Sequence, residues 1–170
     1  MTDQNCAQCG KPISEPGSFF VDGELTCPCC LFGDVAPVLI HPIGVVRRKD
    51  TLPETAKPGE LQKEVCRIEL APGQERFLHK LDEEKELEII FYFHKTDSVK
   101  TRFKRGPMND GKEVGPFAAR TPHRTSRLGN SRVKLLSLEG TTLRVTGLDA
   151  LDNTPVLDIK AVMKQNPDDK

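Results

Sequence analysis

Six cysteines are the residues of this 170-residue chain whose spacing most directly predicts chemistry. Five of them lie within the first 30 residues, in the segments Cys6-Ala-Gln-Cys9 and Cys27-Pro-Cys29-Cys30. Two Cys-x2-Cys pairs separated by a hairpin-length gap can bring four thiolates to one point, which is the ligand set of a structural zinc ion. We therefore predict that Cys6, Cys9, Cys27 and Cys30 bind Zn2+. A redox-active pair or an iron site is the alternative.

The residues around these pairs predict a zinc ribbon over residues 1–34. Gly10 gives the first Cys-x2-Cys turn a permissive backbone. Residues 19–26 form two short apolar runs on either side of Asp22-Gly23, which predicts two strands joined by a tight turn. So short a segment buries little apolar surface, and bound metal would supply folding free energy on the order of 10 kcal/mol.

Two cysteines fall outside this arrangement. Cys29 either replaces a ligand of the second pair or remains a free thiol. Cys66 stands alone in the sequence and shares one face of a predicted strand with Ile68 and Leu70. A cysteine on an apolar strand face is predicted to lie in the core.

Composition excludes several classes of function. Lys plus Arg (25) equals Asp plus Glu (25), so no overall charge attracts the chain to nucleic acid or anionic lipid. The longest apolar stretches, 36–40 and 87–93, are far shorter than the roughly 20 residues that cross a bilayer. The polar start Met1-Thr-Asp-Gln-Asn lacks the basic and apolar regions of a secretory signal. We expect a soluble, cytoplasmic protein with no membrane partner.

Charge is nevertheless distributed unevenly along the chain. Residues 95–134 carry eleven Lys or Arg against three carboxylates, a net charge of +8. Residues 1–34 carry one Lys against five carboxylates, and residues 82–88 carry one Lys against five more. The basic segment is predicted either to line a groove for phosphates or to form a solvated face that pairs with the acidic segments.

Beyond residue 41 the pattern predicts many short strands and few helices. Residues 86–93 form the strongest strand, and their near-continuous apolar run indicates a central position or burial on both faces. Weak periodicity over 73–85 predicts a short helix, and 104–115 has loop composition. Further strands are predicted at 43–47, 64–70, 117–120, 131–138, 142–147 and 155–160, with Glu139-Gly140 closing a hairpin. The fold class is mainly β, either a barrel or a sandwich.

The C-terminal part of the chain carries motifs of a known family. They are Gly115-Pro-Phe-Ala-Ala-Arg-Thr-Pro-His-Arg124, Leu128-Gly129, Val133-Lys-Leu-Leu136 and Gly147-Leu-Asp-Ala-Leu-Asp-Asn-Thr-Pro-Val-Leu-Asp-Ile-Lys160. With 43–47 and 93–95, these motifs resemble the TsaA/YaeB-like family. Its members are S-adenosylmethionine-dependent enzymes that methylate N6 of threonylcarbamoyl-adenosine next to the anticodon of a threonine tRNA. The resemblance covers residues 41–163.

This resemblance implies a small β-barrel of the TsaA-like type, preceded by the zinc ribbon and assembled as a homodimer. The expected domains are the ribbon at 1–34, the methyltransferase barrel at 41–163 and a polar tail at 164–170. S-adenosyl-L-methionine is the implied cofactor. No predicted strand leads into a Gly-x-Gly-x-x-Gly turn and a helix, which agrees with a site unlike the Rossmann type.

The resemblance also implies which residues form the site. Cofactor contacts are expected from His94, Lys95, Arg120, Asn130, Leu148, Asp149, Ala150 and Leu151. Methyl transfer to an exocyclic amine needs alignment and a hydrogen-bond acceptor but no strong base. Asp149 and Asp158 are therefore the candidate catalytic residues, with a backbone carbonyl as the alternative. The tRNA phosphates are expected to bind Lys104, Arg105, Arg124 and Arg127.

The chain departs from the family pattern in segments expected to form the pocket. Arg124-Thr-Ser-Arg-Leu-Gly129 stands where the family has Arg-Pro-Asn-Pro-Ile-Gly, and Ala161-Val162 stands where it has Pro-Tyr. Glu84-Lys85-Glu86 replaces Phe-Ser-His. The leading hypothesis is a diverged tRNA methyltransferase. A methyltransferase of a non-RNA substrate, and a zinc-ribbon interaction module with an inactive barrel, are the alternatives.

Overall fold

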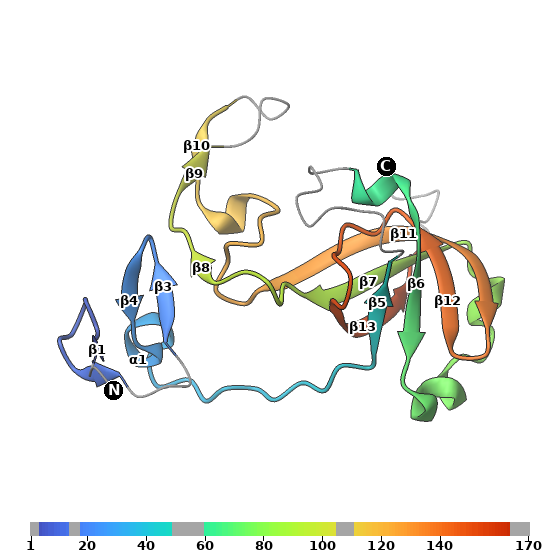
Figure 1. Ribbon diagram of the computed structural model, residues 1–170, viewed down its shortest axis with the longest axis horizontal. Helices are drawn as coiled ribbons and strands as arrows, with labels where there is room; N and C mark the ends of the chain where they lie inside the picture. The colour runs from blue at the N-terminus through green and yellow to red at the C-terminus, as the bar shows by residue number, and fades with distance from the viewer. Residues whose placement is uncertain (1–3, 14–17, 49–59, 105–110, 164–170) are drawn as a thin grey trace. The chain divides into compact units, whose positions relative to one another are not determined.

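The computed structural model describes residues 4–13, 18–48, 60–104 and 111–163, which fall into two compact units (Figure 1). One unit comprises Ile40–His94 and Leu128–Lys170, and the other comprises Met1–Leu39 and Lys95–Arg127. The segment Lys95–Arg127 thus interrupts the first unit in sequence but groups with the N-terminal residues. The sequence-based boundaries assign this segment to the barrel domain. The predicted tail at 164–170 lies outside the described residues.

Six strands of the first unit form a closed barrel, which confirms the prediction of a mainly β fold (Figure 1). The strands are β5 (Gly44–Arg47), β6 (Val65–Leu70), β7 (Glu86–Tyr92), β11 (Leu128–Glu139), β12 (Thr142–Thr146) and β13 (Pro155–Ala161). Their order is β11-β12-β6-β5-β13-β7, all neighbours are antiparallel, and β7 closes the barrel by pairing with β11. In this order every strand of the barrel has a neighbouring strand on both sides.

The core of the barrel follows from period-2 alternation along its strands. In β7, Leu87, Ile89 and Phe91 are at most 2% exposed, while the residues between them are half-buried. The predicted central position of this strand is confirmed, since it pairs with both β11 and β13. Burial on both faces is not observed, because a barrel buries only its inner face. Cys66 on β6 is 2% exposed, which confirms its predicted place in the core.

Two short motifs of the sequence have direct structural reasons. Glu139 and Gly140 connect β11 to β12 as the predicted hairpin, with Gly140 at φ 58°. Gly129 is buried on β11, and a Cβ atom added there would lie 2.4 Å from a ring carbon of Phe91 and 2.9 Å from one of Phe93. Gly129 of the family pattern is therefore required by the close approach of two aromatic rings.

Three local predictions differ from the structure. The helix predicted at 73–85 is replaced by two 3-10 helices, Pro72–Phe77 and Leu81–Glu83, because the stretch is too weakly periodic to sustain an α-helix. The strand predicted at 117–120 is wrong: Pro116–Ala118 is a 3-10 helix with proline at its first turn. The loop predicted at 104–115 is bounded by two-residue strands, β9 (Phe103–Lys104) and β10 (Glu113–Val114).

The second unit contains the predicted ribbon. Strands β1 (Gln4–Asn5) and β2 (Pro12–Ile13) pair around the first cysteine turn, and β3 (Phe19–Val21) pairs with β4 (Glu24–Thr26). The Asp22-Gly23 turn between β3 and β4 is confirmed, with φ of 51° and 90° at its two residues. A short helix, α1 (Pro28–Phe32), follows β4.

Strand β8 (Ser98–Val99) extends the ribbon hairpin to a three-stranded sheet in the order β4-β3-β8. Cys6 and Val99 are the only apolar side chains of this unit that are buried among the described residues. The unit therefore has almost no hydrophobic core. In the described part of the chain, no helix has the length and apolar character needed to span a bilayer.

Candidate cofactor loop and metal centre

The loop Leu148–Leu151, which joins β12 to β13, holds four of the predicted cofactor-binding residues. Leu148 and Ala150 are 0% and 4% exposed and belong to the barrel core. Asp149 between them is half-buried, and its N–H donates to Ser131 Oγ at 3.3 Å. Because the two flanking side chains are committed to packing, the loop offers the Asp149 carboxylate and backbone groups to a ligand.

Arg48, which sequence reasoning missed, fixes the backbone of this loop. Its Nε donates to the carbonyl oxygen of Ala150 at 2.6 Å, and its Nη2 donates to that of Leu148 at 2.6 Å. Its Nη1 donates to the carbonyl oxygen of Leu61 at 3.2 Å. The guanidinium therefore holds the carbonyl groups on both sides of Asp149. An arginine that follows a strand gives no sequence signal of this role.

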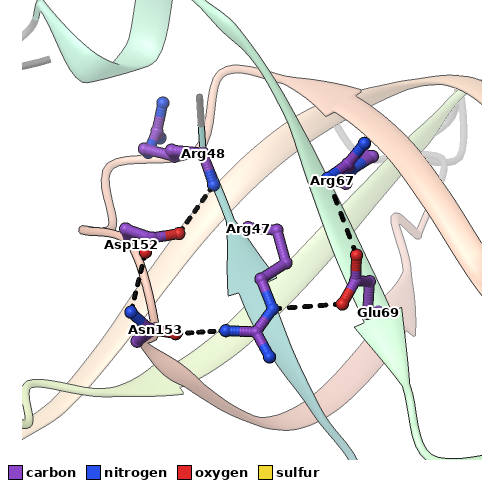
Figure 2. Close-up of polar contacts among 6 residues, drawn as sticks. All are labelled: Arg47, Arg48, Arg67, Glu69, Asp152 and Asn153. Carbon is purple, nitrogen blue, oxygen red and sulfur yellow. Dashed lines mark hydrogen bonds and ion pairs between the residues drawn. The ribbon is translucent and has the colours of Figure 1, made fainter. Parts of the chain in front are cut away.

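A polar network on β5 and β6 fastens the far end of the loop (Figure 2). The Arg48 N–H donates to Asp152 Oδ1 at 2.8 Å, and Asn153 Nδ2 donates to Asp152 Oδ2 at 2.7 Å. Arg47 donates to the side-chain oxygen of Asn153 and, through Nε, to Glu69 Oε2 at 3.0 Å. This network holds the turn at Asp152 and Asn153 against the barrel wall.

His94 and Asn130 come from strands next to this loop. His94 follows β7, and its Nδ1 lies 3.4 Å from Oγ1 of the buried Thr154. The Thr154 N–H in turn donates to the carbonyl oxygen of Leu151 at 3.3 Å. His94 is thus linked to the loop through two hydrogen bonds. Asn130 is an exposed residue of β11, opposite Ile90 of β7.

Asp158, the second candidate catalytic residue, lies on β13 beside a bulge in the pairing with β7. One carboxylate oxygen accepts the N–H of Ile159 at 2.9 Å, and the other pairs with the Lys160 ammonium. The hydrogen bond to Asp158 raises the pKa of Lys160 above its ordinary value. Both oxygens of Asp158 are therefore already engaged, whereas the hydrogen bond described for Asp149 uses its backbone N–H.

The remaining predicted residues belong to the second unit. Lys95, Lys104 and Arg120 are exposed, and Arg105 lies outside the described residues. Arg124 is half-buried, and its Nη2 donates to the carbonyl oxygens of Pro116 and Ala119 at 2.7 and 3.0 Å.

Arg127 is also half-buried, and its guanidinium carbon lies 5.6 Å from the centroid of the Phe19 ring. Arg124 and Arg127 thus stabilise their own unit, whereas Lys104 and Arg120 present their charges to solvent. The first two arginines therefore have a structural role, whereas the charges of Lys104 and Arg120 are accessible to a ligand.

The structure gathers the four predicted metal ligands. One sulfur each of Cys6, Cys9, Cys27 and Cys30 lies within 4.8 Å of all the others. The Cys6–Cys30 and Cys9–Cys27 sulfur pairs are each 3.9 Å apart. Four sulfurs tetrahedral around zinc at about 2.3 Å lie about 3.8 Å from one another. The spacing therefore fits a four-cysteine zinc site, and the exposed Cys29 lies outside the cluster.

Hydrogen bonds within the cluster shift the pKa values of two of its thiols in opposite directions. The N–H of Cys27, with smaller contributions from neighbouring backbone groups, lowers the pKa of Cys6 to about 6. Hydrogen bonding of the Cys30 thiol to Cys27, and then to Cys9, raises its pKa to about 12. One thiolate in the cluster thus opposes ionisation of the next. A bound divalent cation removes this opposition, because it favours all four thiolates.

An antiparallel barrel with a loop held in this way belongs to the small-barrel class, not to the doubly wound sheets that bind nucleotides at a Gly-rich turn. Within that class, residues 46–167 match the family model described as the tRNA-methyltransferase O N-terminal domain, and the chain belongs to this family. The four cysteines of the cluster lie outside the matched residues.

Individual relatives agree with this assignment. A probable S-adenosyl-L-methionine-binding protein of Archaeoglobus fulgidus is 34% identical over 72% of this chain and 33% of its own length. A tRNA (adenine(37)-N6)-methyltransferase of Mus musculus is 38% identical over 51% of this chain and 20% of its own length. A crystal structure of TrmO from Pseudomonas aeruginosa is similar at 27% identity and a TM-score of 0.56, over 79% of this chain and 62% of that one. The chain thus spans only part of these relatives.

Proposed function

We propose that this protein is an S-adenosylmethionine-dependent methyltransferase that acts on N6 of threonylcarbamoyl-adenosine in tRNA. The family match over residues 46–167 carries the proposal, because it includes the loop Leu148–Leu151 and five complete barrel strands. The names of relatives supply the activity: the mouse protein is a tRNA (adenine(37)-N6)-methyltransferase, and the archaeal protein is a probable S-adenosyl-L-methionine-binding protein.

The groups around the loop fit the chemistry of this cofactor. Asp149 offers a half-buried carboxylate that suits the hydroxyl groups of adenosine or the positive charge of a sulfonium, and its backbone is held from both sides. His94 adds a ring nitrogen next to the loop. When bound, the cofactor supplies an electrophilic methyl group. Lys95, Arg120 and Asn130 are proposed as further contacts.

The residues of the loop have a limited chemical task. An exocyclic amine releases its proton only after it has gained the methyl group, so the protein needs no strong base. Asp149 accepts a hydrogen bond from the amine and aligns its nitrogen, and the fixed loop keeps that acceptor in place. Asp158 is the second candidate for this part, although its oxygens are engaged by Ile159 and Lys160.

The proposed RNA contacts are electrostatic. Lys104 is an exposed cation in a segment with nine Lys or Arg against three carboxylates over residues 95–127. Arg105, Arg124 and Arg127 are proposed to add to the same field. Each phosphate contact increases the salt dependence of RNA binding, which makes that dependence a direct measure of the interface.

The decisive experiment compares modified nucleosides in threonine tRNA from cells with and without this protein. Loss of the N6-methyl group on threonylcarbamoyl-adenosine is expected when the protein is absent. Labelled methyl groups that appear in small molecules but not in tRNA would indicate a non-RNA substrate. Failure to transfer methyl groups to any fraction would instead leave an inactive barrel.

Calorimetric titration tests the cofactor site separately. The purified protein is expected to bind S-adenosylmethionine, and Arg120→Ala is expected to weaken binding about ten-fold, or about 1.4 kcal/mol. Arg144→Ala, which removes an exposed arginine of β12, is the matched control and is expected to bind normally. Absence of cofactor binding by the wild-type protein would exclude the proposed activity.

We further propose that Cys6, Cys9, Cys27 and Cys30 bind a structural zinc ion. The sulfur spacing and the chemistry of four thiolates support this, and a closed site of four cysteines leaves no open position for catalysis. Elemental analysis of anaerobically purified protein is expected to give one zinc per chain. Iron in place of zinc, or no metal, would overturn the assignment.

We also propose that the protein is a cytoplasmic homodimer. A reducing compartment keeps the thiols available to a metal, which supports the location, and the family resemblance supports the dimer. Fractionation of cells and sedimentation of the purified protein test the two statements. Mass of a single chain at all concentrations would exclude the dimer.

A further inference from the structure

The insertion Lys95–Arg127 is attached to the ribbon through backbone hydrogen bonds. Strand β3 pairs in parallel with β8, so that Phe20 lies opposite Ser98 and Val21 lies opposite Val99. The N–H of Asp22 donates to the carbonyl oxygen of Val99 at 2.9 Å. Segments far apart in the sequence thus share one sheet, whose other strand, β4, leads directly to Cys27.

Side chains reinforce this attachment. The Asp22 carboxylate accepts the N–H of Thr101 at 3.0 Å and also the Thr101 hydroxyl. These bonds, and secondarily the charges of Lys100 and Arg102, lower the pKa of Asp22. The acidic turn of the ribbon is therefore bound to a basic stretch of the insertion.

An aromatic contact connects the metal ligands to the end of the insertion. Phe32 is the last residue of α1, the short helix that carries Cys30. Its ring packs edge-to-face against Phe19, with centroids 5.3 Å apart, and Phe19 contacts the guanidinium of Arg127. Because Cys30 lies on α1, a metal held by the cysteine cluster would fix this helix and with it the Phe32 ring that packs on Phe19.

The insertion has no core that could fold it alone. Among residues 95–104 and 111–127, Val99 is the only apolar side chain that is buried, and it lies on the strand paired with the ribbon. The insertion also carries nine cations against three carboxylates over 95–127. The excess positive charges repel one another. Neither apolar burial nor charge balance within the insertion favours its folded form.

We propose that metal binding by the four cysteines folds the ribbon and the insertion as one module, and that the insertion presents its cations to RNA only while the metal is bound. The metal would supply the free energy that this module lacks from apolar burial. Both halves rest on the proposed metal site, and the RNA-binding half rests also on the proposed substrate.

Amide hydrogen exchange on the full chain tests the folding half. The reporters are Lys100 N–H, which donates to His123, and Thr101 N–H, which donates to Asp22. In Cys30→Ser, their protection is expected to fall at least about ten-fold, while the Val46 and Leu70 amides of the barrel keep theirs. Cys29→Ser is the matched control, because Cys29 lies outside the cluster, and it should retain metal and protection.

A second variant separates the attachment from the metal itself. Asp22→Gly removes both bonds to Thr101 and tolerates the positive φ of this position. Its zinc content is expected to match the wild type, while protection of the Thr101 amide falls. Unchanged protection of Lys100 and Thr101 in Cys30→Ser would overturn the proposal, as would loss of protection throughout the barrel.

Binding of an RNA stem-loop with the anticodon of a threonine tRNA tests the second half. Affinity of Cys30→Ser is expected to be at least about ten-fold below that of Cys29→Ser, with a smaller salt dependence. If the zinc protein binds the stem-loop no better than Cys30→Ser does, the RNA-binding half is wrong. If it binds no RNA at all while exchange behaves as expected, the proposed substrate fails and the folding half stands.

Discussion

The barrel and the ribbon–insertion module use different sources of stability. Fourteen of the sixteen buried apolar side chains among the described residues lie in the barrel unit, including Ile68, Leu87 and Phe91. The other unit has only Cys6 and Val99. Apolar burial stabilises by about 25 cal/mol per Å2, so the barrel can fold by packing alone. The second unit has too little buried apolar surface for this, so it depends on hydrogen bonds and ion pairs and, as proposed, on bound metal.

This difference separates the parts of the site. The loop around Asp149 is anchored to the core through Leu148 and Ala150 and is fixed by Arg48. The exposed cations proposed for RNA belong to the unit with little core. We therefore expect the loop around Asp149 to keep its structure when loss of the proposed metal unfolds the ribbon–insertion module.

The largest expected effect is in the barrel core. Phe91→Ala removes a side chain that is 2% exposed and packs edge-to-face on Phe93, and it is expected to lower the free energy of unfolding by about 3–5 kcal/mol. Denaturant titration measures this change. Phe77→Ala, at a position 70% exposed in the same unit, is the control and should cost less than about 0.5 kcal/mol. Equal effects of the two variants would contradict the assigned core.

Cysteine substitutions compare the two units with one residue type and have a smaller expected effect. Cys66 lies in the barrel core, whereas Cys9 belongs to the cysteine cluster. Burial raises the pKa of Cys66, which keeps this thiol neutral. Cys66→Ser buries a hydroxyl in an apolar site and is expected to destabilise the barrel by about 1–3 kcal/mol, with zinc content unchanged. Cys9→Ser, measured in parallel, is expected to lower zinc content. Loss of zinc from Cys66→Ser would show that the two classes of cysteine are not distinct.

Much of the barrel could be predicted from the sequence because its strands alternate. Burial alternates along β7 and β6 as the side chains do, and Glu139-Gly140 defines a hairpin without reference to distant residues. The segment after Gly115 lacks such alternation. Its Pro-Phe-Ala-Ala run is apolar like a strand, yet the proline and the lack of a pairing partner among the described residues favour a 3-10 turn.

The site could be predicted only where local spacing determines it. Two Cys-x2-Cys pairs define a common point, and the structure places their four sulfurs together. Arg48 could not be found in this way, because its partners are carbonyl oxygens about 100 residues away in the sequence. The attachment of 95–127 to the ribbon was also missed, since a two-residue parallel strand such as β8 has no pattern of its own.

Arg48 gives the next expected effect, on binding and not on folding. Arg48→Lys keeps the charge but cannot donate to Leu148, Ala150 and Leu61 together, so the loop around Asp149 loosens. The dissociation constant for S-adenosylmethionine is expected to rise about ten-fold, or about 1.4 kcal/mol. Arg67→Lys, at a side chain 59% exposed with a 3.8 Å ion pair to Glu69, is the control. Normal cofactor binding by Arg48→Lys would remove the positioning role.

The smallest expected effect is at the junction of ribbon and insertion. Asp22→Asn keeps the shape of the side chain but removes its negative charge, so the Thr101 amide donates to a neutral oxygen and the Thr101 hydroxyl must accept instead of donate. Protection of the Thr101 amide at neutral pH is expected to fall by a few-fold, and zinc content should not change. A fall in zinc content would mean that the variant acts on the metal site instead.

The pH dependence of the difference in Thr101 amide protection between the wild type and Asp22→Asn tests whether the Asp22 carboxylate is its source. The pKa of Asp22 is lowered in the folded protein from an ordinary value of 3.8, first by Thr101 and then by Lys100 and Arg102. A lowered pKa contributes stability above pH 3.8, and that contribution is lost as the pH falls through the folded-state pKa. The wild-type advantage in Thr101 protection is therefore expected to shrink below about pH 4. Release of the metal on protonation of the cysteines would unfold the module in both proteins, so zinc content is measured at each pH. A difference that persists below about pH 4 while zinc is retained would assign the contact to shape and not to charge.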